Sequence, residues 1–196
     1  MFDYSYHMKR LITDISRRSR TFGHIDGRRI LVAVSWARNN KKHGLQAKLV
    51  PLKFSGGRRT IQTGGNWYCM MPKVLYNGRE ILYVVYFCLP RFVRLSFDEK
   101  LKIIFHELYH ISPSFNGDIR RFPGKFYQHT RSEREYDRIV ESFSRRYLKS
   151  RHSRKLTRFL RLGYDDLRER YGEVDGMRLR LPEPILFKRE RKRRRG

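Results

Sequence analysis

The stretch from Ser96 to Ile111 constrains the fold more than any other part of the chain. Ser96 and Glu99 have the spacing of a capping box, which predicts the start of a helix, and Pro113 predicts its end near Ile111. The apolar residues fall on one stripe of this helix: Leu101, Ile104, Phe105, Leu108 and Ile111. The pattern predicts a core helix that buries this stripe.

The same helix carries the sequence His-Glu-x-x-His at His106, Glu107 and His110. At 100° per residue the two histidines lie about 40° apart, on the side opposite the apolar stripe. Both imidazoles can then reach one ion, while the glutamate is displaced around the helix and can take a proton from water. The pattern predicts one Zn²⁺ per chain, held by His106 and His110, with Glu107 as the catalytic general base.

A catalytic zinc ion needs a third protein ligand, and the residues after the helix offer three candidates. His129 lies at the end of a loop, where the chain turns back into another predicted helix, and it is the preferred ligand. Glu133, one turn into that helix, is the alternative. Asp118 is a weaker candidate, because Arg120 and Arg121 offer it ion pairs. Whichever acid is not a ligand is able to orient a ligand histidine.

The remaining pattern predicts an α+β fold with a mainly antiparallel sheet. Pro51 cannot donate to a strand ladder, so the strand that contains it is expected at a sheet edge. Asn77-Gly78 predicts a hairpin turn. The predicted elements are an N-terminal helix with apolar positions from Tyr4 to Ile15, strands at 30–36, 44–54 and 80–89, and a helix from near Ser132 with Tyr136, Ile139, Val140, Phe143 and Tyr147 on its apolar face.

The charge of the chain indicates a polyanionic partner. There are 45 Lys and Arg against 19 Asp and Glu, a formal net charge of +26. Such an excess favours non-specific nucleic-acid binding over other anionic surfaces, and we expect the basic C-terminal region to carry it. Composition changes at Lys149, which divides the chain into a domain at 1–148, a basic extension at 149–187 and a disordered basic tail at 188–196.

The location expected from the sequence is the cytoplasm, in association with the nucleoid. The N-terminus has no apolar region typical of a secretory signal, and the longest apolar run, Ile81 to Leu89, is half the length of a membrane helix. Cys69 and Cys88 lack zinc-ligand spacing and are expected to be reduced thiols.

Four stretches resemble a known family. They are "FGHIDGRRILVAVSWAR", "HGLQAKLVPLKF", "HELYHISPSFNGDIRRFPGKFYQHT" and "RYGEVDGMRLRLPEP". Together, over about residues 20–184, they resemble the phage-type metallopeptidase domain, a family of small zincin-like proteins. The resemblance implies a zincin-like fold, peptidase activity, His106, His110 and His129 as ligands, and Glu107 as the base. More distantly, the chain is similar to SprT-like proteases, although it lacks the cysteine zinc-binding appendage that many of them carry.

Two functions from different classes fit these observations. The first is a zinc-dependent metallopeptidase that acts near nucleic acid on a protein or peptide substrate. The second is a nucleic-acid-binding accessory protein whose metal site is structural or vestigial. A metal-dependent nuclease is less favoured, because acidic residues are sparse around the His-Glu-x-x-His helix.

Overall fold

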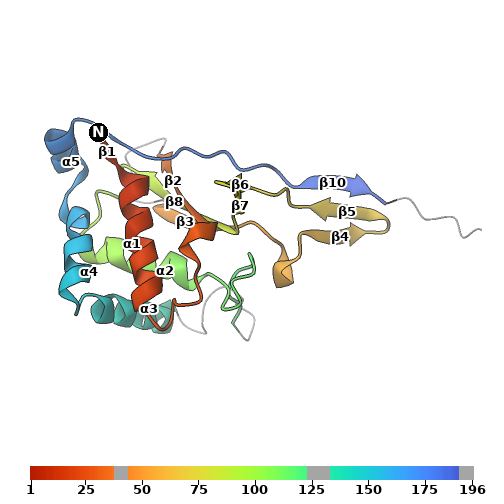
Figure 1. Ribbon diagram of the computed structural model, residues 1–196, viewed down its shortest axis with the longest axis horizontal. Coiled ribbons are helices and arrows are strands. Elements are labelled where there is room, and N and C mark those ends of the chain that lie inside the picture. The colour runs from red at the N-terminus through yellow and green to blue at the C-terminus, as the bar shows by residue number, and fades with distance from the viewer. Residues whose placement is uncertain (38–43, 123–132, 190–196) are drawn as a thin grey trace, which may run out of the picture.

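The computed structural model describes residues 1–37, 44–122 and 133–189, and these form an α+β fold, as predicted (Figure 1). Within these ranges the central sheet has the strand order β2–β8–β3. Its strands are β2 (Ile30–Trp36), β3 (Ala47–Pro51) and β8 (Tyr83–Leu89). Strand β8 is buried at every position, because it pairs with a strand on each side and both of its faces are covered.

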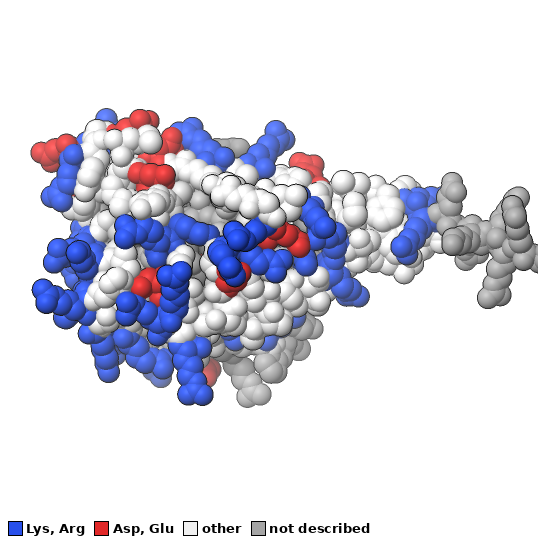
Figure 2. Space-filling model, in the orientation of Figure 1, with Lys and Arg blue, Asp and Glu red and all other residues white. Residues whose placement is uncertain are grey.

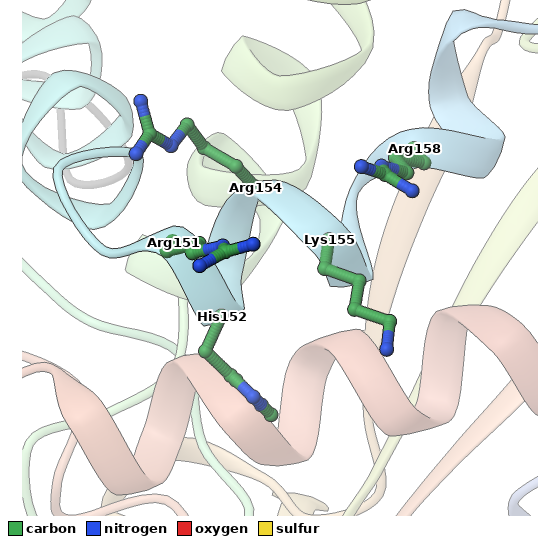
Figure 3. Close-up of a pocket in the computed structure, with 5 residues that line it drawn as sticks. All are labelled: Arg151, His152, Arg154, Lys155 and Arg158. Carbon is green, nitrogen blue, oxygen red and sulfur yellow. The ribbon is translucent and has the colours of Figure 1, made fainter.

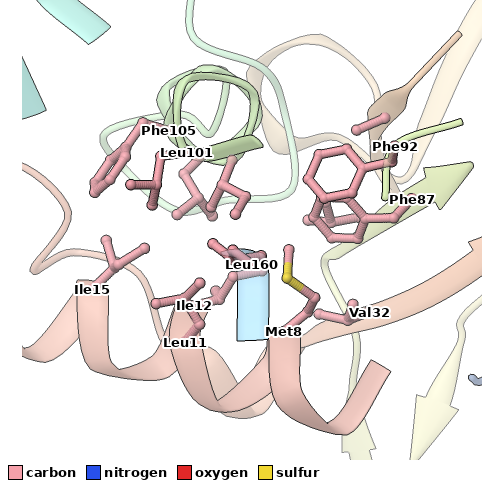
Figure 4. Close-up of a cluster of buried hydrophobic side chains, with 14 of the residues drawn as sticks. Met8, Leu11, Ile12, Ile15, Val32, Phe87, Phe92, Leu101, Phe105 and Leu160 are labelled. Atoms are coloured by element: carbon pink, nitrogen blue, oxygen red, sulfur yellow. The ribbon is translucent and has the colours of Figure 1, made fainter. Parts of the chain in front are cut away.

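Three helices share a core with one face of this sheet; the first two contact its strands, and the third packs on the second. They are α1 (Tyr4–Arg18), α2 (Phe97–Tyr109) and α3 (Glu133–Tyr147). Alternate β8 residues, such as Val85 and Phe87, join this helical core, because side chains alternate between the faces of a strand. Figure 4 shows the α1 side chains of this core, among them Ile12 and Ile15, facing Leu101 and Phe105 of α2.

The opposite face of the sheet is covered by an extended segment near the C-terminus. Val84 and Tyr86 point to this side and pack with Met177, Leu179 and other apolar residues. The Val34 N–H donates to the Met177 carbonyl at 2.8 Å, and the Tyr86 hydroxyl donates to the Leu179 carbonyl at 3.0 Å. The free edge of β2 is thereby partly closed, whereas β3 forms the other edge.

A second sheet extends away from the helices (Figure 1). Its order is β10–β5–β4, with antiparallel pairing throughout. Its strands are β4 (Thr60–Gly64), β5 (Trp67–Met70) and β10 (Ile185–Lys188). The C-terminal region therefore reaches back to pair with a strand from the middle of the sequence.

The remaining C-terminal elements pack against the helical core. They are α4 (Arg151–Leu156), the 3-10 helix η3 (Arg158–Arg161), α5 (Tyr164–Tyr171) and β9 (Val174–Asp175), which pairs in parallel with β1 (Phe2–Asp3). Leu160, Leu167 and Val174 belong to the same core as α1 and α2. The described residues also include the 3-10 helices η1 (Gly27–Arg29) and η2 (Ser55–Gly57). A short hairpin consists of β6 (Leu75–Tyr76) and β7 (Arg79–Glu80).

Most predicted elements are present, with three differences. Helix α2 ends at Tyr109, two residues before the predicted end, because Ile111 already bridges to Ile119. The strand predicted at 80–89 begins at Tyr83 and is the central strand of its sheet. The described strands of the two main sheets pair mainly in antiparallel fashion, as predicted, but β2 and β8 run parallel, a long-range pairing that no local pattern specifies.

Several local predictions are confirmed. Asn77 and Gly78 both have positive φ, at 49° and 71°, as a tight hairpin turn requires, and they connect β6 to β7. The strand that contains Pro51 lies at a sheet edge. Cys69 and Cys88 are free thiols. In the described part of the chain no helix is both long and apolar enough to cross a membrane.

Most of the predicted basic tail, residues 190–196, lies outside the described residues.

Lys100 connects the first turn of α2 to the C-terminal elements. Its side chain is 2% exposed, and its ammonium donates to the carbonyls of Leu160 and Leu162 at 2.9 and 3.0 Å. Burial lowers the pKa of Lys100 to about 8, although the Asp166 carboxylate acts in the opposite direction. The folded chain therefore holds a cation that is costly to bury but donates hydrogen bonds to two backbone carbonyls.

We expect Lys100→Met to lower the free energy of unfolding by about 1–3 kcal/mol at pH 7, because two carbonyls lose their donor. The unfolded chain binds more protons at this lysine between pH 8 and 10.5, so the stability of the parent protein rises with pH there, by at most about 2–3 kcal/mol. The difference between the two proteins should consequently grow across that window. Urea unfolding at several pH values measures it, and a difference that shrinks with rising pH would contradict the buried-cation interpretation.

Candidate metal centre

Helix α2 is positioned by its cap and by its apolar stripe. The predicted capping box is present: the Ser96 N–H donates to Glu99 Oε2 at 2.8 Å, and the Glu99 N–H donates to Ser96 Oγ at 3.3 Å. The buried apolar residues of the helix are Leu101, Ile104, Phe105 and Leu108. Because these side chains face the core, His106 and His110 lie on the other side and are only half-buried.

The structure brings the two histidines of the motif together. Their Nε2 atoms lie 2.9 Å apart, and their ring planes are inclined at 81°. His106 is inside the last turn of α2, while His110 is the C-cap residue and still has helical dihedral angles. The i, i+4 spacing therefore directs both imidazoles at one point, as the sequence predicts.

This pair of nitrogen atoms fits a zinc ion. Two imidazole ligands of a tetrahedral zinc ion have nitrogen atoms about 3.3 Å apart, for zinc–nitrogen distances of about 2.0–2.1 Å. The observed separation of 2.9 Å needs only a small outward movement of the two rings. Imidazole nitrogen is also a ligand that zinc accepts readily.

Glu107 lies between the helix and the edge strand. Its side chain is buried, and Oε2 accepts a hydrogen bond of 2.6 Å from the Leu49 N–H in β3. Burial raises the pKa of Glu107 to about 7, while the bond from Leu49 acts in the opposite direction. The hydrogen bond from Leu49 fixes the position of the Glu107 carboxyl group and connects α2 to the sheet edge.

The loop after α2 holds the end of the helix. The Arg120 N–H donates to the His110 carbonyl at 2.6 Å, and Arg120 Nε donates to the Tyr109 carbonyl at 2.7 Å. The guanidinium also lies over the Tyr109 ring, 4.3 Å from its centroid. A cation at the carbonyl end of a helix is favourable, so this arginine stabilises the turn that presents His110.

Asp118 is occupied by the same loop. Its carboxylate accepts from the Gly56 N–H at 2.8 Å and from Arg121 Nη2 at 3.0 Å, and its carbonyl accepts from the Tyr83 hydroxyl at 2.8 Å. The side chain is buried. This geometry gives Asp118 a role in fixing the loop to η2 and β8. Of the two ion pairs expected for it, the one with Arg121 is present, whereas Arg120 bonds Tyr109 instead.

Tyr136 of α3 lies against both histidines, a role that the sequence pattern did not reveal. Its ring centroid is 4.9 Å from that of His106 and 5.8 Å from that of His110. The residue is 1% exposed, and burial, followed by the Glu107 charge, raises the pKa of its hydroxyl. The periodicity of α3 identified Tyr136 only as an apolar position, since the spacing alone does not show what the helix packs against.

A hollow leads along α2 to the motif. It has a volume of about 430 Å³ and runs from Gly44–Ala47, at the start of the edge strand, to His106 and Glu107. Lys102 and Asp137 form an ion pair of 2.6 Å on its lining, which connects α2 to α3. His106 and Glu107 are therefore reached from the surface next to the β3 edge.

The preferred third ligand lies outside the described residues. His129 falls in the undescribed range 123–132, and Glu133 is the first residue of α3, with a side chain that is also undescribed. Among the described residues, no group of three or more His, Cys, Asp or Glu side chains is gathered closely enough to hold a metal ion. The choice between His129 and Glu133 stays a prediction.

The fold and the histidine pair define an α+β domain with a His-Glu-x-x-His helix beside a sheet edge. The sequence matches the model of the family described as "Putative phage metallopeptidase" over residues 3–157, and the chain belongs to this family. No curated protein and no solved structure matches the chain. The family implies a metal cofactor, and the match covers α1, the central sheet, α2 and α3.

The structural role of Asp118 can be tested separately from ligation. We expect Asp118→Asn to lower the free energy of unfolding by about 1–3 kcal/mol, because the charge-assisted bond to Arg121 is lost and the Gly56 contact is weakened. The folded variant should still bind one metal ion per chain. Thermal unfolding and metal analysis measure the two effects, and loss of metal from a folded variant would show that Asp118 is a ligand.

Proposed function

We propose that the chain is a zinc-dependent metallopeptidase with a zincin-like active site, and that it acts near nucleic acid. The observation that supports this most directly is the pair of imidazole nitrogen atoms 2.9 Å apart, next to the buried carboxyl group of Glu107. Membership of the metallopeptidase family supports the same conclusion.

The residues of the chain have separate roles in this proposal. His106 and His110 hold the ion, with His129 as third ligand and Glu133 as the alternative. A bound Zn²⁺ polarises the peptide carbonyl and lowers the pKa of a water molecule. Glu107 accepts a proton from that water and later transfers it to the leaving amine. The hydrogen bond from Leu49 keeps the carboxyl group oriented for both transfers.

Strand β3 offers the place for an extended peptide. Gln46 bonds to Cys88 of β8 and Leu52 bonds to Leu82 just before it, so the alternate residues Ala47, Leu49 and Pro51 direct their backbone polar groups away from the sheet. The Leu49 N–H already donates to Glu107 and Pro51 has no N–H, so along this stretch a peptide would pair mainly with the outward carbonyl groups. An extended peptide can add to such an edge through main-chain hydrogen bonds, which bind many sequences alike. The same edge lines the hollow that reaches His106 and Glu107, which supports a substrate path along β3.

The association with nucleic acid rests on charge. A net charge of +26 attracts polyanions without sequence preference, and the C-terminal region from Lys149 carries much of the excess. An enzyme held on nucleic acid would meet proteins that are bound there. Such proteins are the substrate class that this proposal favours.

Removal of a histidine tests the metal site. We expect the purified parent chain to contain about one zinc ion per chain, and His106→Ala to lose it, because one neutral imidazole is removed from the set. His152→Ala is the matched control, since His152 is 54% exposed and pairs with Asp14 on α1. Elemental analysis measures both. Equal zinc content in His106→Ala and the parent would contradict the site.

Removal of the carboxyl group tests the chemistry. We expect Glu107→Gln to keep its zinc but to hydrolyse casein or histones about 10²–10⁴ times more slowly, because the amide cannot accept the proton. Glu141→Gln, an exposed glutamate on α3, serves as the control and should retain full activity. If the parent binds zinc yet cleaves neither substrate, with or without single-stranded DNA, the metal is structural and the accessory-protein alternative is favoured.

A further inference from the structure

One face of the α4–η3 segment is entirely cationic. Arg151, Arg154, Lys155 and Arg158 follow the i, i+3, i+4, i+7 spacing of a single helical face, and all four are exposed. The opposite face carries the buried residues of the segment, which are Ser153, Thr157 and Leu160. Packing therefore fixes which way the segment faces and turns the four cations to solvent.

Among the described residues, these cations have no carboxylate partners. Within the described ranges, no Asp or Glu oxygen lies within 4 Å of any of them. The sequence from 142 to 164 contains no acidic residue at all. Like charges at i, i+4 destabilise a helix, and Arg151 with Lys155 in α4 is such a pair. An anion bound at this face would offset the repulsion between the cations.

The four cations line an open hollow of about 780 Å³ together with His152. Figure 3 shows His152 and Lys155 pointing from α4 toward α1. Figure 2 shows Lys and Arg side chains crowding the surface of α1, α3 and α4. The hollow thus lies inside a wider positive surface, which raises the local concentration of polyanions.

A second hollow, of about 430 Å³, adjoins the first and shares His152, Lys155 and Arg158 with it. It adds two further cations, Arg10 and Arg170, and a set of aromatic rings: Phe2, His7, Phe159 and Tyr171. The rings contact one another, with Phe2 stacked on His7 at 4.3 Å and Phe2 lying 5.1 Å from Tyr171. The Tyr171 side chain is 41% exposed, so part of its ring is open to a ligand.

We propose that these two hollows, which we call the α4 groove, bind single-stranded nucleic acid. The phosphates lie against Arg154, Lys155 and Arg158, and an unpaired base stacks on Tyr171. Cations beside exposed aromatic rings suit a single strand, because a duplex hides the faces of its bases. This inference deepens the nucleic-acid association proposed above by assigning it to one surface of the folded chain.

The α4 groove is separate from the candidate metal centre. Lys100, in the first turn of α2, holds η3 through the carbonyls of Leu160 and Leu162. His106 lies six residues further along that helix, roughly 9 Å along its axis. A bound strand can therefore anchor the chain without entering the hollow beside β3.

The experiment measures binding of a fluorescently labelled single-stranded oligonucleotide to the full chain over a series of salt concentrations. The groove variant carries Arg154→Gln, Lys155→Gln and Arg158→Gln. Its matched control carries Lys73→Gln, Arg79→Gln and Arg180→Gln, which are exposed cations that line neither hollow. Each variant removes three charges, so the net charge of the two is equal. Circular dichroism and zinc content show that both are folded.

We expect the groove variant to bind the strand at least about tenfold more weakly than the parent, with a salt slope smaller by up to about 2. The control should stay within about threefold of the parent. Tyr171→Ala should weaken binding of the single strand about fivefold or more but leave binding of the matching duplex unchanged, and Tyr171→Phe should restore it.

The other outcomes overturn the assignment. Equal losses in groove variant and control would mean that only net charge matters. Equal binding of duplex and single strand, with no effect of Tyr171→Ala, would exclude stacking. Stronger competition by phosphatidylserine vesicles or polyglutamate than by the oligonucleotide would identify another class of partner. A parent chain that binds no nucleic acid would also remove the association proposed above, whereas the zinc and casein measurements would still decide the peptidase.

Discussion

Burial of the apolar stripe of α2 is the constraint on which the rest of the structure depends. Leu101 and Phe105 face the α1 side chains of the core, and this fixes the rotation of the helix about its axis (Figure 4). The rotation in turn decides that His106 and His110 face away from the core. Bonds at both ends hold the helix along its axis: the capping box with Lys100 at the start, and Arg120 at the last carbonyls.

The bond between Glu107 and the Leu49 N–H connects this helix to the sheet edge. In the proposed mechanism, strand β3 both orients the catalytic base, through the Leu49 N–H, and binds the peptide. A peptide that adds to β3 would therefore be in register with the base without any contact to its side chains. In this proposal, main-chain pairing at β3 would align the scissile bond with the base.

Local signals predicted the parts of the structure that depend on local interactions. The capping box, the stripe of α2 and the positive φ of Asn77 and Gly78 follow from neighbouring residues. The central position of β8 does not, because it depends on pairing with strands more than thirty residues away in sequence. For the same reason the contacts of Tyr136 with the histidines and of Asp118 with η2 could not be predicted. The helical periodicity of α3 gives its apolar face but not its neighbour.

The arrangement of the acidic residues, more than the number of basic ones, shapes the charged surface. Glu80 interacts with three cations near β7, and Asp118, Asp137 and Asp175 each pair with one. Asp14, the acid beside α4, is largely buried and interacts with Tyr147, Arg18 and His152. With only 19 acidic residues against 45 basic ones, the carboxylates that stabilise loops and helix contacts are unavailable to the α4 groove. Its positive potential is therefore a consequence of how the fold distributes its few acids.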